Sequence, residues 1–212
     1  RAGTLDLFRL YDESSIVVGG ERLTSSVEEL SRILIKFDYS GLKPLMSSSM
    51  NIHSSSFKAE LQLFEVPLGT PTPSNFSVVC YPLAKAFDEG SGASVNGFSD
   101  AGAANFFTAS YSNGSNVTWE MSGSGLGGPV MNRNKVDYLV SGNIGPVNLD
   151  LGASQYFSEG PGNLFLDVTT VVSQSLMGNL KNHGFRISLS GSDETDSKTR
   201  FVKRFLSRQS KN

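Results

Sequence analysis

The sequence holds little of what metal centres, disulfide scaffolds and catalytic triads require. The 212 residues include one cysteine, Cys80, which has no internal partner for a disulfide. The two histidines, His53 and His183, lie far apart and outside any metal-ligand spacing. No Gly-x-Ser-x-Gly elbow accompanies the serines around His53. We therefore predict no metal, no cofactor and no catalytic residue.

Long apolar runs and charge are also scarce. No run approaches the ~18 consecutive apolar residues of a membrane span, and the beginning of the sequence lacks the charged start and apolar core of a signal peptide. Charged residues make up 18% of the chain, below the roughly 25% of an average soluble domain. The net charge of −2 gives no whole-chain argument for nucleic acid. We expect neither a membrane nor a nucleic acid as a partner.

The small net charge conceals an asymmetry. Residues 198–212 contain six basic residues and no acidic one, whereas all 20 acidic residues and the other 12 basic residues precede them. A body of −8 therefore carries a C-terminal segment of +6. Apolar residues are interleaved with these charges, in a pattern suited to a strand that packs on a body. Phosphate binding and protection of a sheet edge are two interpretations. We favour a third, an inter-subunit contact made by Lys203, Arg204 and Arg208.

Strand patterns dominate the rest of the chain. Residues 57–63 alternate strictly, with Phe57, Ala59, Leu61 and Leu63 on one face. Residues 76–81 follow a Gly/Pro loop, and together the two segments predict a hairpin with a long connection. Further strands are predicted at 32–38, 116–120, 163–167, 184–190 and 203–207. Helix signals are limited to residues 168–180 and to one turn that begins at Thr24.

Many short strands between Gly-, Pro- and Ser-rich turns predict an all-β protein, and we favour a jelly-roll-like antiparallel β-sandwich with long Gly/Ser-rich loops. A cut at the Gly-rich residues 122–129 would give two domains. Neither half alone shows a full set of strands for its own core, so we predict a single domain over residues 1–212. Residues 198–212 form its basic C-terminal segment.

Three groups of residues suggest chemistry, and each has a simpler interpretation. Asp88 and Glu89 are candidates for glycoside hydrolysis, but loop carboxylates more often cap turns or face solvent. The oxygen-rich residues 193–196 suggest a calcium site and fit an exposed turn equally well. Trp119 is a candidate for stacking on a sugar ring. Packing of Trp119, Phe106 and Phe107 in the core is the favoured alternative.

The order of several segments resembles the DNRLRE-type β-sandwich domains. The resemblance rests on residues 31–38, 57–64 and 76–83, then on Asp-Val-Thr at 167–169, Asn-His-Gly-Phe at 182–185 and Phe-Leu-Ser-Arg at 205–208. Residues 5–11 and 201–205 look similar to phage virion proteins that are built on this domain. Domains of this type continue into one more apolar strand, whereas this sequence stops at Asn212. That strand is either absent from this sequence or supplied by a neighbouring chain.

The resemblance implies a non-enzymatic structural component of a bacteriophage virion, such as a decoration, neck, collar or tail-associated protein. It would form homo-oligomers and contact capsid, neck or tail proteins. Related domains include carbohydrate-binding modules. The alternative function is therefore a module for host-surface glycans, with Trp119 as the stacking residue.

Overall fold

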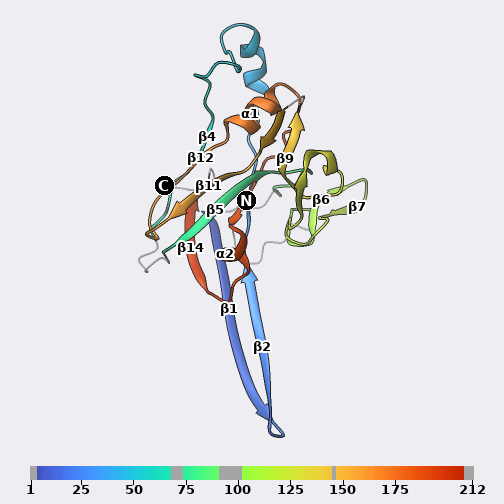
Figure 1. Cartoon of the computed structure of the whole chain (residues 1–212). Helices are drawn as coiled ribbons and strands as arrows, with labels where there is room; N and C mark the ends of the chain where they lie inside the picture. The colour runs from blue at the N-terminus through green and yellow to red at the C-terminus, as the bar shows by residue number, and fades with distance from the viewer. Residues whose placement is uncertain (1–3, 68–73, 91–101, 145–146, 208–212) are drawn as a thin grey trace.

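Strands make up most of the structure, which is a computed structural model that describes residues 4–67, 74–90, 102–144 and 147–207 (Figure 1). The strands are β1 (Thr4–Val18), β2 (Glu21–Leu30), β3 (Ile33–Ile35), β4 (Glu60–Leu63), β5 (Phe76–Pro82), β6 (Thr108–Ser112), β7 (Ser115–Thr118), β8 (Gly127–Pro129), β9 (Tyr138–Ile144), β10 (Val147–Asp150), β11 (Ala153–Phe157), β12 (Leu164–Asp167), β13 (Phe185–Leu189) and β14 (Arg200–Leu206). The helices are α1 (Thr169–Leu176), α2 (Gly191–Thr195) and the 3-10 helices η1 (Ser40–Ser47) and η2 (Val130–Asn132).

Two groups of strands enclose the main core. One sheet has the order β11-β5-β13-β3, and the facing sheet has the order β14-β1-β2. A bridge between Glu65 and Phe205 joins the pair β12-β4 to the free side of β14. Side chains from both groups, among them Leu7, Leu63 and Ile187, meet in one buried cluster. The prediction of an all-β sandwich is confirmed, whereas a jelly-roll strand order is not.

A smaller cluster lies beside this core. The hairpin β6-β7 and the sheet β10-β9-β8, in which β8 and β9 run parallel, extend from one side of the sandwich (Figure 1). Leu83, Ala109 and Trp119 form the buried centre of the smaller cluster. Asp137, whose side chain is fully buried, accepts hydrogen bonds from the backbone of Glu120, Met121 and Leu126. These bonds hold the Gly-rich loop at residues 122–129 against the body.

Alternation predicted several strands correctly. In β4, Leu61 and Leu63 are buried while Glu60 and Gln62 are exposed. The strands predicted near residues 163–167, 184–190 and 203–207 form β12, β13 and β14, and the helix predicted within residues 168–180 forms α1. In β13 all five side chains are buried, because Arg186 and Ser188 contact buried partners on the second face.

Two expectations about neighbouring segments are wrong. The segments at 57–66 and 76–81 do not form a hairpin: β4 pairs with β12, and β5 pairs with β11 and β13. Leu61 and Leu63 lie opposite Leu166 and Leu164, so the apolar faces of β4 and β12 match in register. The turn predicted to begin at Thr24 is not helical, because residues 21–30 form β2 and pair with β1 along their whole length.

Cys80 is inert in the folded protein, because β11 and β13 flank it and almost none of its surface is exposed. Burial raises the pKa of its thiol to about 12, so the reactive thiolate is nearly absent at neutral pH. We expect no labelling by Ellman's reagent in native buffer and labelling of one thiol per chain in guanidinium chloride. Rapid stoichiometric labelling of the native protein would show that β5 is accessible.

Candidate functional site

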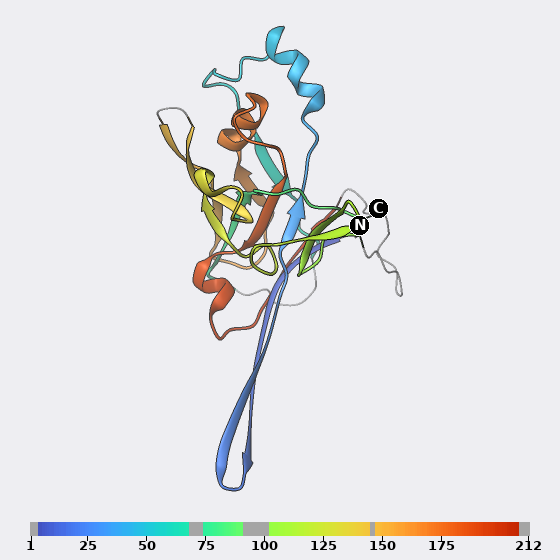
Figure 2. The ribbon, with the colours of Figure 1, turned by 90° about the vertical axis from the view of Figure 1, so that its right-hand side faces the viewer.

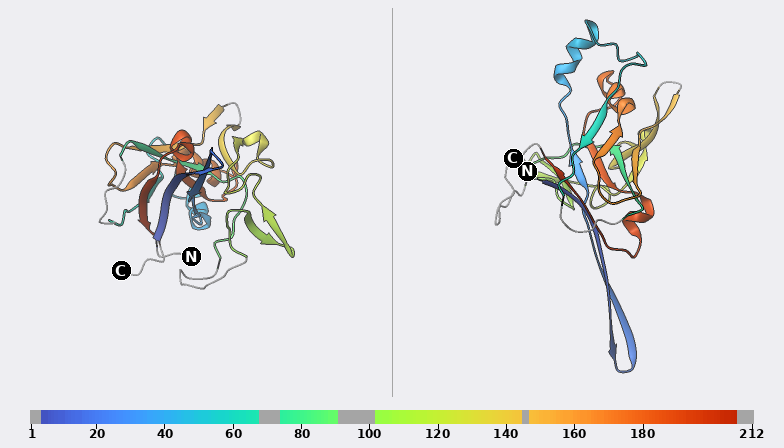
Figure 3. Two further views of the ribbon diagram at one scale, coloured as in Figure 1. Left: turned by 90° about the horizontal axis from the view of Figure 1, so that it is seen from below. Right: turned by 90° about the vertical axis from the view of Figure 1, so that its left-hand side faces the viewer.

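A hairpin projects from the sandwich into solvent (Figures 1 and 2). Every side chain from Asp12 to Glu29 is exposed, whereas Leu7 and Arg9 of the same strand are buried. We call residues 12–29 the arm. The right-hand view of Figure 3 shows the arm leaving the body without folding back on it.

Two glycines close the arm. Gly19 and Gly20 have φ angles of 62° and 88°, which fits the type I′ turn that matches the twist of a two-residue hairpin. From there the register is unbroken, from Val18 opposite Glu21 to Arg9 opposite Leu30. The Gly-Gly pair after the apolar residues 16–18 is a recognised hairpin signal. It was the one sequence signal for the arm, and the sequence-based prediction of strands did not include it.

The two faces of the arm differ. Residues opposite each other point to the same side of a hairpin, which places Ile16 with Leu23 and Asp12 with Val27. Val18 lies on this side as well, since it is two residues from Ile16. The four apolar side chains on this face are between 51% and 61% exposed. We call Ile16, Val18, Leu23 and Val27 the apolar face; the other face carries mostly Ser, Thr, Glu and Arg side chains.

The arm is poorly stabilised by itself. In the order β14-β1-β2, β14 pairs with β1 only up to Arg9, so no third strand lies along either edge of residues 12–29 within the described part of the chain. An isolated two-stranded hairpin is marginally stable in water. Five carboxylates and one arginine give the arm a net charge of −4. An acidic ribbon with one apolar face is suited to contact a surface outside its own chain.

Three arginines anchor the root of the arm to α2. Arg9 is buried in β1 and donates hydrogen bonds to the carbonyl oxygens of Glu194 and Asp196. Arg32 forms two bonds to the Glu194 carboxylate, at 2.8 and 2.9 Å, and Arg186 approaches the same carboxylate at 3.3 Å. Burial lowers the pKa of Arg186, and the nearby Arg32 lowers it further. Glu194 is therefore the shared counter-charge of two arginines.

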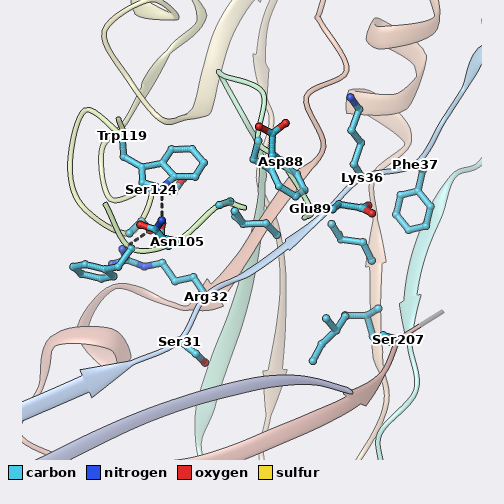
Figure 4. Close-up of a pocket in the computed structure, with 18 of the residues that line it drawn as sticks. Ser31, Arg32, Lys36, Phe37, Asp88, Glu89, Asn105, Trp119, Ser124 and Ser207 are labelled. Carbon is cyan, nitrogen blue, oxygen red and sulfur yellow. Dashed lines mark hydrogen bonds between the residues drawn. The ribbon is translucent and has the colours of Figure 1, made fainter. Parts of the chain in front are cut away.

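A groove of about 730 Å³ lies next to this cluster of arginines, and Arg32 is one of the residues that line it (Figure 4). It follows the chain from Leu30 to Asp38, and its opposite wall includes Phe87, Asn105 and Trp119. Leu5, Leu63 and Leu206 of the sandwich also line it. The groove was not predicted, because its walls come from seven segments that are distant in the sequence.

The aromatic candidates are placed differently from one another. Trp119 is buried, and its indole N–H donates a 2.9 Å hydrogen bond to the carbonyl of Asn105. This confirms core packing for Trp119 and leaves no exposed indole face for a sugar. Core packing for Phe106 and Phe107 is wrong, because their rings are 49% and 68% exposed. Asn105 accepts the backbone N–H groups of Phe107 and Thr108 in a tight turn, and the Phe106 ring lies beside Gly123 at the groove.

The acidic candidates are tied to local structure. The Asp88 carboxylate accepts the backbone N–H of Tyr111 at 3.0 Å, and Glu89 lies beside it in the groove. Residues 193–196 lie in and after the short helix α2, where Asp193 accepts the backbone N–H of Ser77. Within the described residues no group of three metal-ligating side chains occurs, and no helix is long and apolar enough to cross a membrane.

The predicted basic contact residues are not equivalent. Lys203 is buried, and its ammonium lies 2.9 Å from Glu65 and 2.7 Å from the carbonyl oxygen of Gly162. Arg204 is half exposed and pairs with Asp6 at 2.7 Å. Arg208 lies outside the described residues. The charge of Lys203 is thus paired with Glu65 of the same chain. β14 is not an edge strand, because residues 64–66 pair with its second side.

Comparison with protein-family models, with curated proteins and with solved structures finds no match for this chain. The resemblance to DNRLRE-type domains therefore stays a prediction.

Proposed function

We propose that this chain is a non-enzymatic structural subunit of a bacteriophage virion and assembles with copies of itself through the arm. One observation supports assembly most strongly: 18 consecutive residues, 12–29, form a hairpin that no other described part of the chain covers. The virion location rests on the ordered sequence motifs that resemble phage structural proteins. Capsid, neck or tail proteins are the proposed further partners.

Charge complementarity favours a second copy of this chain as the binding partner of the arm. The arm has a net charge of −4 and the C-terminal segment, residues 198–212, has +6. Lys203 and Arg204 are paired within the chain, and Lys198, Arg200, Arg208 and Lys211 supply the remaining positive charge. The arm of one copy is therefore complementary to the C-terminal segment of the next. Such a head-to-tail contact closes into a ring or extends as a filament.

The apolar face predicts which substitutions abolish assembly. Combining Ile16→Ser with Leu23→Ser should weaken self-association about 100-fold or more, because burial of each apolar side chain contributes about 1.5–3 kcal/mol. Both side chains are already exposed in the single chain, so its own folding should change little. Sedimentation velocity over a concentration series measures the effect.

Val17 provides the matched control. It lies between Ile16 and Val18 in the sequence, it is 72% exposed, and its side chain points to the other face of the arm. Val17→Ser should leave the association constant nearly unchanged. Equal effects of the two variants would mean that the apolar face is not the contact. For the virion location, mass spectrometry of purified particles should find peptides of this chain in stoichiometric amounts, and their absence would contradict that location.

A further inference from the structure

β3 is an edge strand whose outer side faces the groove. In the order β11-β5-β13-β3, β13 is the one partner of β3 among the described residues. The carbonyl of Gly184 accepts the N–H of Leu83 on the β5 side. The next residue, Phe185, therefore directs its backbone groups toward its partner Ile35. By the same alternation the N–H and C=O of Leu34 point away from β13, and Leu34 lines the groove.

The groove has the form of a strand-binding site. It follows the chain from Leu30 to Asp38, and Leu34 and Ile35, whose side chains point to opposite faces of β3, both line it. A strand of typical length, about 17–20 Å, fits beside this stretch of chain. We propose that the groove binds an extended segment of a different partner protein, which adds as a strand to the free edge of β3. Such binding gains affinity from main-chain hydrogen bonds and specificity from alternate side-chain pockets.

Both walls of the groove are apolar, which defines the side chains of the partner segment. On one side Leu5, Leu63 and Leu206 line it, and on the other Phe87 and Trp119 do. A strand in the groove would direct alternate side chains to these two walls. The central residues of the partner segment are therefore apolar on both faces.

The rim charges exclude the arm of a second copy and favour a basic segment. Arg32 shares the carboxylate of Glu194 with Arg186. Three acidic side chains, Asp38, Asp88 and Glu89, line the groove against two basic ones, Arg32 and Lys36. The arm, at −4, would be repelled. The partner segment thus combines an apolar centre with flanking Lys or Arg, and this inference is independent of the proposed assembly through the arm.

Titration with synthetic peptides tests the inference. The probe is a peptide of about nine residues, with alternating Val and Leu at its centre and two lysines at each end. Trp119 is the single tryptophan and lines the groove, so its fluorescence should report binding. The amide NMR signal of Leu34 should shift at the same time. N-methylation of alternate peptide bonds should weaken binding about tenfold, because it removes main-chain hydrogen bonds between the peptide and β3.

A charge reversal at the rim of the groove provides the second part of the test. The Asp38 carboxylate accepts local hydrogen bonds from the neighbouring Ser40. Asp38→Lys should weaken binding of the lysine peptide about two- to tenfold. It should strengthen binding of a peptide in which glutamates replace the lysines. Glu159→Lys, an exposed reversal outside the groove lining, should do neither. Equal binding of the N-methylated peptide would refute strand addition. Binding of glycans but not peptides would assign the groove to sugars, and no response to any peptide would show that the chain itself closes the groove.

Discussion

Glu194→Gln is expected to lower the free energy of unfolding by about 3–5 kcal/mol, the cost of leaving a buried ion pair without one partner. Its carboxylate accepts two hydrogen bonds from Arg32 and two longer ones from Arg186, at 3.3 and 3.5 Å. The side chains of Arg186 and Glu194 are 3% and 14% exposed, so water replaces the lost partner poorly. Without the negative charge, two guanidinium groups would face each other at the root of the arm.

Urea unfolding followed by circular dichroism measures this loss. Glu159→Gln, an exposed carboxylate, is the control and should change stability by less than about 0.5 kcal/mol. An unchanged denaturant slope would show that both proteins unfold from comparable native states. A loss below about 1 kcal/mol for Glu194→Gln would mean that the arginines find other partners.

Lys203→Glu is expected to prevent stable folding or to cost about 3–5 kcal/mol or more. The Lys203 ammonium lies 2.9 Å from Glu65 and 4.3 Å from the centre of the Phe157 ring, and the side chain is fully buried. Burial lowers the pKa of Lys203, and the bond to Glu65 opposes that shift. The substitution would place two carboxylates side by side in this site. Thermal unfolding and the yield of soluble protein measure the effect.

Arg204→Glu is the matched control for this prediction. Arg204 is the next residue, but its side chain is 41% exposed and its partner Asp6 is 39% exposed. A surface pair of this kind contributes about 0–1 kcal/mol, so the reversal should cost about 1 kcal/mol. If Lys203→Glu cost no more than Arg204→Glu, the buried pair would not hold β14 in place. Charge reversals designed to test assembly should therefore use Lys198, Arg208 and Lys211, and leave Lys203 and Arg204 unchanged.

The features predicted from sequence are those that local patterns determine. Leu61 and Leu63 were placed on a buried face because burial of one face of a strand imposes a period of two. The helix α1 and the burial of Trp119 also followed from local composition. The pairing of β4 with β12 could not be predicted, because it depends on segments about 100 residues apart that meet only in the folded chain.

The arm, the buried position of Lys203 and the exposure of Phe106 and Phe107 were missed for different physical reasons. Residues 12–29 bury no face, so their sequence lacks the alternation that packing imposes, and only Gly19 and Gly20 indicate a hairpin. Lys203 follows a strand pattern that suggests an exposed charge, but Glu65 supplies a buried counter-charge from a distant segment. Phe106 and Phe107 look like core residues by composition, but both lie at the surface of the folded chain.

The central claim is that the arm joins one copy of this chain to the next. Deleting residues 12–17 and 22–27 removes six pairs of opposite residues from the hairpin. The deletion joins Tyr11 to Val18 and Glu21 to Glu28. The Gly-Gly turn stays, and because six is even, each remaining side chain keeps its face. The most direct measurement compares the molar masses of the intact and shortened chains by light scattering. We predict an oligomer for the intact chain and a folded monomer for the shortened one. Equal masses for the two, either both monomeric or both assembled, would contradict the account.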